Sequence, residues 1–97
     1  MAVRFREAAL LDLEQIFEFS FARFGVQTAQ AYRDGLQHVF ALLDRNPGIG
    51  PANEFLGSGI RSFAFKSHRI YYEIDNGDVI VARILHKAQD VADKLDP

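Results

Sequence analysis

The chain is 97 residues long, 48% hydrophobic and carries a formal net charge of −2, which predicts a single cytoplasmic domain over residues 1–97 with one small core. It lacks cysteine, a run of about 18 apolar residues and the apolar centre of a signal peptide, so disulfides, cysteine-based metal sites and a membrane partner are not expected. Its three histidines (His38, His68 and His86) show no metal-ligand spacing, and a slightly acidic chain is a poor general binder of nucleic acid, so we expect no metal and no other cofactor.

Two helices are predicted in the first half of the chain, after a short strand at residues 3–6. Apolar side chains recur every three or four residues over 9–24, and Gly25 ends this helix as a left-handed cap. A second apolar stripe covers residues 29–43 and is closed by an asparagine and a proline at 46–47. The two helices therefore form a helical hairpin.

Three strands are predicted in the second half, after a loop at 48–59 that is rich in Gly, Pro, Asn and Ser. They cover residues 60–66, 68–75 and 78–86. The last two are joined by an Asn-Gly pair, the strongest short signal for a two-residue hairpin turn. The second half is therefore an antiparallel meander.

The Asn-Gly turn also predicts which side chains share a face of the hairpin, because directly opposed residues point the same way. The face expected against the helices collects Ile70, Tyr72, Ile74, Val79, Val81 and Leu85. The other face, expected to be an open concave surface, collects Arg69, Tyr71, Glu73, Ile80, Ala82, Ile84 and His86. Arg83 falls on the apolar face beside Ile70, so it needs a route to solvent or a carboxylate partner.

Several polar residues are candidates for function, each with a purely structural alternative. His86 and Lys87 follow a buried strand, a poor place for charge unless something binds there; His86 could transfer a proton, or could simply close the strand through a hydrogen bond. Arg61 and Arg83 could contact a partner, or could pair inside the fold with Asp12 or Asp90.

Phe19 stands off the main apolar stripe of its helix, which makes it a candidate for an exposed apolar patch that a partner covers. Glu54, in the loop that precedes the strands, is a possible base. Arg69, Tyr71 and Glu73 could form a reactive row or an ordinary polar ladder between strands.

The segments that carry a family resemblance are, in chain order, 8–13 (AALLDL), 46–50 (NPGIG), 59–63 (GIRSF), 68–72 (HRIYY) and 83–86 (RILH) with Asp90. In this order and length they resemble the RelE/ParE superfamily of small bacterial toxins from type II toxin–antitoxin systems, and within it the ParE branch. The resemblance covers almost the whole chain.

The resemblance implies an α+β protein with a β-α-α-β-β-β fold, in which an N-terminal helical hairpin packs on an antiparallel sheet. It also implies a cognate antitoxin whose C-terminal segment wraps the toxin, and growth inhibition when that antitoxin is degraded. Such systems are associated with plasmid stabilization. ParE-like members inhibit DNA gyrase, whereas RelE-like members cut mRNA on the ribosome.

Departures from the ribonuclease pattern favour a gyrase inhibitor that is not an enzyme. Arg69 matches an arginine that ribonuclease members direct at the scissile phosphate, but Lys87 and two uncharged residues follow His86 where those members carry histidine or tyrosine. The strand at 60–66 also lacks their many lysines.

The residues expected to bind gyrase or the antitoxin are Phe19, Arg61, Tyr71, Arg83 and His86. The alternative is a ribosome-dependent endoribonuclease that uses Glu54, Arg69, His86 and Lys87, and a third possibility is a toxin fold that only binds.

Overall fold

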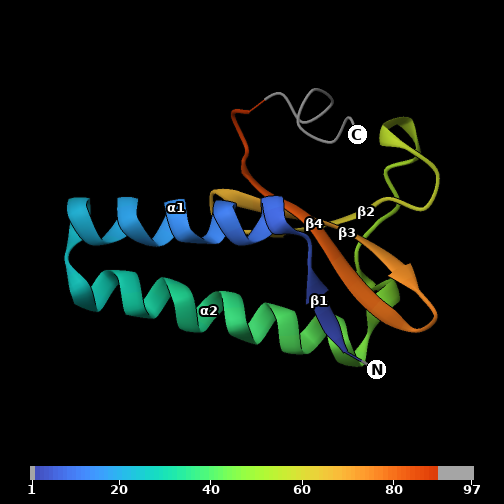
Figure 1. Cartoon of the computed structure of the whole chain (residues 1–97), viewed down its shortest axis with the longest axis horizontal. Helices are drawn as coiled ribbons and strands as arrows, with labels where there is room; N and C mark the ends of the chain where they lie inside the picture. Colours follow the sequence, from blue (N-terminus) through green and yellow to red (C-terminus); the bar gives the residue numbers. More distant parts are fainter. Residues whose placement is uncertain (1, 90–97) are drawn as a thin grey trace.

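The computed structural model describes residues 2–89 and shows two helices packed on a four-stranded sheet (Figure 1). The elements are, in chain order, β1 (Val3–Phe5), α1 (Glu7–Phe24), α2 (Val26–Arg45), the 3-10 helices η1 (Pro47–Ile49) and η2 (Glu54–Leu56), β2 (Arg61–Phe65), β3 (His68–Asp75) and β4 (Asp78–His86). The predicted α+β class and β-α-α-β-β-β order are confirmed.

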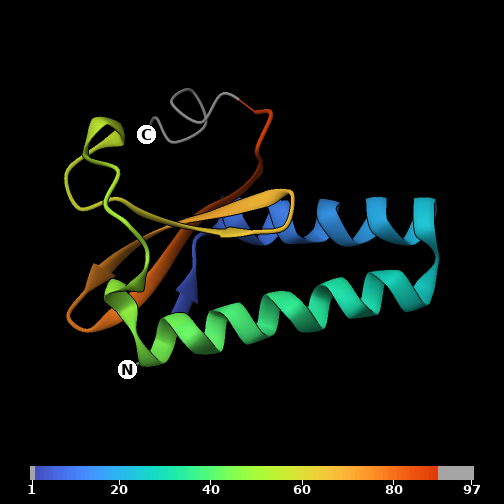
Figure 2. The ribbon, with the colours of Figure 1, turned by 180° about the vertical axis from the view of Figure 1, so that it is seen from behind.

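The helical hairpin extends well beyond the sheet at its turn (Figures 1 and 2). Gly25 ends α1 as predicted, with a positive φ of 90° and its N–H bonded to the Phe21 carbonyl oxygen, although its ψ of 175° differs from that of a left-handed helical residue. Neither helix is long and apolar enough to cross a membrane, and this holds for all of the described residues.

The sheet is mixed, with the strand order β1-β4-β3-β2. The pairs β2–β3 and β3–β4 are antiparallel, as predicted, but β1 lies parallel to β4, with Val3 opposite Val79. The expectation of a wholly antiparallel sheet is therefore wrong. A parallel pair needs a long crossover, and here the helical hairpin is part of the chain that connects β1 to β4.

A β-bulge divides the β3–β4 hairpin into two parts. From the turn to the pair Tyr72–Val81 the register is the predicted one, but Tyr71 then lies opposite Arg83, so that Ala82 is an extra residue in β4. One extra residue reverses the facing of every side chain beyond it. The predicted register is therefore wrong between the bulge and the end of β4.

The two faces of the sheet differ from the prediction in the same region. Ile84, predicted on the open face, packs with Ile70 and Tyr72 in the main core beneath the helices. Leu85, predicted to face the helices, is buried on the opposite side against Tyr71.

That opposite side holds a second small hydrophobic cluster, completed by Ile60 and by Leu56 of η2. Figures 1 and 2 show the loop with η2 at the end of the molecule away from the hairpin turn. The open polar surface that the sequence predicts is therefore partly covered by this loop.

A buried tyrosine fixes the start of the same loop. The Tyr72 hydroxyl donates to the Pro47 carbonyl oxygen at 2.7 Å and accepts the Gly50 N–H at 2.9 Å. A Cβ on Gly50 would lie 2.5 Å from the Ser62 carbonyl oxygen and 2.6 Å from the Tyr72 hydroxyl. Only glycine fits at this position, because backbone atoms cannot move aside as a flexible side chain does.

We predict that Gly50→Ala destabilises the fold by about 2 kcal/mol, since the added methyl forces the loop away from the sheet. Gly48→Ala is the matched control, because a Cβ there meets nothing within 4 Å; it should change stability by about 0.5 kcal/mol or less. Urea denaturation midpoints measure both. Similar midpoints for the two variants would contradict the close packing at Gly50.

Candidate functional site

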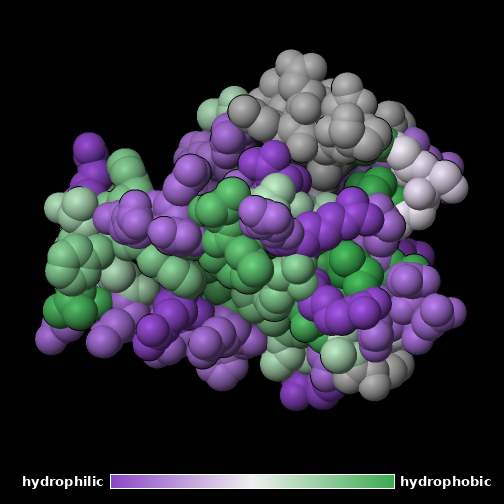
Figure 3. All heavy atoms as spheres, in the orientation of Figure 1, coloured by the Kyte–Doolittle hydropathy of each residue, from purple (hydrophilic) through white to green (hydrophobic). Residues whose placement is uncertain are grey.

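A groove of about 680 Å³ lies between α1, α2 and the ends of β3 and β4 that meet the β2–β3 turn. One end of this groove is apolar and is lined by Ile16, Phe19 and Phe24 of α1. Phe19 is 60% exposed, so its predicted place outside the core is confirmed. Figure 3 shows further hydrophobic surface at the tip of the helical hairpin, where Phe21 and Val26 are also exposed.

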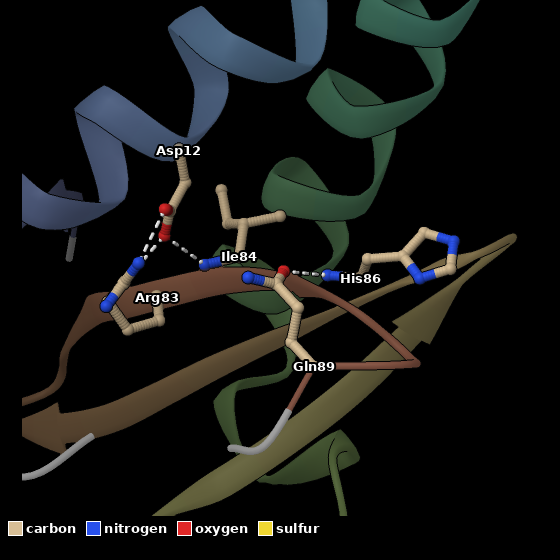
Figure 4. A network of polar contacts seen from close by, with 5 residues as sticks. All are labelled: Asp12, Arg83, Ile84, His86 and Gln89. Atoms are coloured by element: carbon tan, nitrogen blue, oxygen red, sulfur yellow. Dashed lines mark hydrogen bonds and ion pairs between the residues drawn. The ribbon is translucent and has the colours of Figure 1, made fainter. Parts of the chain in front are cut away.

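An ion pair between Asp12 and Arg83 forms one wall of the groove. The Asp12 carboxylate accepts hydrogen bonds from Arg83 Nε at 2.7 Å and Nη2 at 2.8 Å, and from the Ile84 N–H at 2.9 Å (Figure 4). The bond to Asp12 raises the pKa of Arg83, so the guanidinium stays charged although it is largely buried.

The expected pairing of Arg83 with Asp12 is therefore present; the alternative partner Asp90 lies outside the described residues. Arg61 does not pair with Asp12, which binds Arg83. The Arg61 guanidinium donates to the carbonyl oxygens of Gly48 and Gly50 at 3.2 and 2.8 Å, which ties β2 to the loop after α2.

The polar end of the groove is built by Tyr32 of α2 with two histidines. His68 begins β3 and lies opposite His86 at the end of β4, with ring centroids 5.5 Å apart. The Tyr32 hydroxyl and His68 Nδ1 are 2.5 Å apart. Burial lowers the pKa of His68, and the neighbouring His86 lowers it further, while Asp12 acts in the opposite sense. Burial also raises the pKa of Tyr32.

His86 itself is exposed and closes its strand through hydrogen bonds, as the structural alternative predicts. Its N–H donates to Gln89 Oε1 at 2.8 Å (Figure 4), and its Nδ1 accepts the Ala88 N–H at 3.1 Å. Lys87 is exposed beyond the strand, and its N–H donates to the Ser67 carbonyl oxygen.

The proposed polar row of Arg69, Tyr71 and Glu73 is not joined by hydrogen bonds within residues 2–89. Arg69 Nη1 donates to Ser62 Oγ at 2.8 Å, and Glu73 pairs with Arg6 at 3.3 Å. Tyr71 is only 8% exposed, and its burial raises the pKa of its hydroxyl. The charge of Arg69 acts on the Tyr71 hydroxyl in the opposite sense to burial, so these two residues are neighbours although no hydrogen bond joins them.

The four residues named for ribonuclease chemistry lie on separate elements. Glu54 begins η2, Arg69 lies in β3, His86 ends β4 and Lys87 follows it, and among the described residues no hydrogen bond or ion pair joins any two of the four. The described part of the chain also contains no group of three or more side chains that could hold a metal ion.

Sequence reasoning missed Tyr32 and His68. The signal for His68 was present, since the Asn-Gly turn pairs the two strand ends. Without the bulge, however, the predicted partner of His68 is Leu85 and not His86. Nothing in the sequence pattern showed that Tyr32 of the second helix would reach this corner of the sheet.

Comparison with known proteins gives the family. Residues 3–91 match the family model described as the ParE toxin of the type II toxin–antitoxin system, parDE. The chain belongs to the ParE toxin family. Toxin ParE1 of Mycobacterium tuberculosis is 35% identical over 85 residues, covering 87% of each chain. Toxin ParE1 of Caulobacter vibrioides is 33% identical over 85 residues, covering 88% of each.

Solved structures of toxin–antitoxin complexes share the fold of this ParE-family chain. A chain of the chromosomal ParDE system from P. aeruginosa matches with a TM-score of 0.76 at 15% identity, over 89% of this chain and 95% of that one. A chain of the RelBE2 complex from Mycobacterium tuberculosis matches with a TM-score of 0.62 at 26% identity, over 91% and 92% of the two chains.

We predict that Arg83→Ala destabilises the protein by about 3 kcal/mol, because it leaves the buried Asp12 carboxylate without its cation. Lys87→Ala, which removes an exposed charge four residues later, should change stability by about 0.5 kcal/mol or less. Denaturant midpoints of the two variants provide the comparison. Equal midpoints would mean that the Asp12–Arg83 pair contributes little to the fold.

Proposed function

We propose that this ParE-family toxin inhibits DNA gyrase and is neutralised by a cognate antitoxin. Family membership supports a toxin that binds its target, since ParE-like proteins act on gyrase. The choice of gyrase over mRNA as the target rests on one observation, which is that the sheet face away from the helices is partly covered. Leu56 and Ile60 pack over Tyr71 and Leu85, in the region where the sequence suggested an open reactive surface.

Cleavage of RNA requires that surface to be accessible and to hold a proton-transfer group beside Arg69. The guanidinium of Arg69 is instead bonded to the hydroxyl of Ser62, whose side chain is buried. His86 is engaged in hydrogen bonds at the end of its own strand. A positioned acid or base contributes about 10² to 10⁴ in rate, so a centre without one is a poor ribonuclease even with an arginine in place.

The ribosome-dependent endoribonuclease stays a second candidate for two reasons. The chain shares its fold with a chain of the RelBE2 complex at 26% identity, and Arg69 stands where RelE-like members place a phosphate-binding arginine. The two candidates make opposite predictions for mRNA, which makes them separable by experiment.

A cognate antitoxin is the second part of the proposal. The structural relatives named above are toxin–antitoxin complexes, and this chain exposes large apolar side chains along α1 that a partner can cover. An amphipathic helix laid in a groove and an extended strand added to a sheet are both recurrent ways to bind such a surface.

We predict that the antitoxin raises the melting temperature of the toxin with increasing concentration, because it binds the folded state alone. Phe19→Ala should weaken the complex by about tenfold or more, since exposed aromatic side chains dominate such interfaces. Ile49→Ala is the control, as Ile49 is an exposed apolar residue of η1 that does not line the groove. An unchanged melting temperature would contradict the antitoxin partner.

We predict that the purified toxin inhibits gyrase supercoiling or traps its cleaved DNA complex, and leaves mRNA on translating ribosomes intact. Plasmid supercoiling assays and primer extension on ribosome-bound mRNA measure the two activities. The ribonuclease candidate predicts the reverse. Codon-dependent cuts that disappear in an Arg69→Ala variant would replace gyrase with mRNA as the target.

A further inference from the structure

The polar end of the groove presents hydrogen-bond donors without a carboxylate to receive them. Among the described residues that line it, Asp12 is the only acidic one. Both oxygens of Asp12 already accept hydrogen bonds, three in total, from Arg83 and from the Ile84 N–H. Among residues 2–89, therefore, no carboxylate is available in the groove for the imidazoles of His68 and His86.

In a neutral imidazole, the hydrogen bond at one ring nitrogen determines whether the other nitrogen donates or accepts. Nδ1 of His86 accepts the Ala88 N–H, so the proton of the neutral ring sits on Nε2. The Tyr32 hydroxyl and Nδ1 of His68 share a hydrogen bond, and which of them donates depends on the tautomer of the ring. Nε2 of His86 is therefore a donor, and Nε2 of His68 is a donor whenever that ring is protonated, whichever tautomer its neutral form adopts. Oxygen acceptors satisfy such donors best when they are charged.

We propose that this groove binds an acidic side chain of the antitoxin, with its carboxylate beside His68 and His86 and the neighbouring apolar side chains of the antitoxin against Phe19 and Phe24. The inference rests on the proposed function and adds the chemistry of recognition to it. Charge complementarity supports this occupant. Lys66 lies over the Tyr32 ring at this end of the groove and Lys87 follows His86 in the chain, whereas the charges of Asp12 and Arg83 balance each other.

The position of His68 in the groove couples antitoxin binding to protonation of its ring. The pKa of His68 is lowered in the free chain, so the ring is neutral near pH 7. A carboxylate beside the ring favours its charged form and raises this pKa in the complex. Binding therefore takes up a proton and becomes tighter as the pH falls. Within the described part of the chain, the charged or titratable groups that face His68 are Asp12 on α1, Tyr32 on α2, Lys66 in the β2–β3 turn, and Arg83 and His86 on β4.

The experiment measures the affinity of the full-length toxin for the full-length cognate antitoxin between pH 8 and pH 6. We expect the dissociation constant of the native pair to fall by roughly tenfold over this range, because one pKa unit corresponds to a factor of ten in an equilibrium constant. His68→Gln should bind more weakly at pH 6 and reduce the pH effect to about twofold or less.

Two further variants separate recognition from folding. His86→Gln changes an exposed residue and keeps a side-chain acceptor for the Ala88 N–H, so it should fold normally and still weaken binding at pH 6. His38→Gln removes an exposed histidine of α2 outside the groove and should retain the native pH effect. Any titration of the antitoxin itself is common to every toxin variant and cancels in the comparison.

The antitoxin side of the contact provides an independent check. Changing each Asp and Glu of the antitoxin to its amide, one at a time, should identify one position whose loss has little further effect in the His68→Gln toxin. A tight complex whose affinity ignores pH and both groove histidines would overturn the inference and leave the proposed function standing. Failure to form any complex would overturn both.

Discussion

The Asp12 carboxylate is the contact on which the arrangement of this molecule depends. β1 pairs with β4 only as far as Val81, and beyond that point no other strand of residues 2–89 borders the outer edge of β4. Asp12 receives the N–H of Ile84 at this open edge and balances the charge of Arg83 at the same time. A helix side chain thus replaces a strand, which fixes α1 against the sheet and creates the groove beside it.

The bulge at Ala82 is the second determinant of the surface. It turns Ile84 toward the helices and Leu85 toward the loop with η2, so one inserted residue supplies both hydrophobic clusters. It also brings His68 opposite His86. Without the bulge, these histidines would be displaced from each other by one position and Leu85 would lie in the main core. The bulge is therefore the common cause of the groove and of the covered face.

The sequence was sufficient to predict the helices and strands because the signals for them are local. The helical stripes, the Asn-Gly turn and the cap at Gly25 each depend on a few neighbouring residues, and the strand limits follow from them. The bulge and the parallel pairing of β1 depend on contacts between distant segments, which no short pattern encodes. Asp12 was found as a partner because a buried arginine requires a carboxylate, whereas Tyr32 is an unremarkable member of a helical stripe and gave no such signal.

The pairing of β1 with β4 has a consequence for how the chain reaches its native state. Residues that hold the first strand and the first helix in place lie 71 to 76 positions later in the sequence. During synthesis the helical hairpin emerges before β4. At that stage β1 has no strand to pair with, and Asp12 has no arginine side chain to bind. Contacts of such long range are slow to form because loop closure precedes them. The groove is therefore absent from every shorter chain that ends before β4, and a growing chain acquires its recognition surface among its last steps.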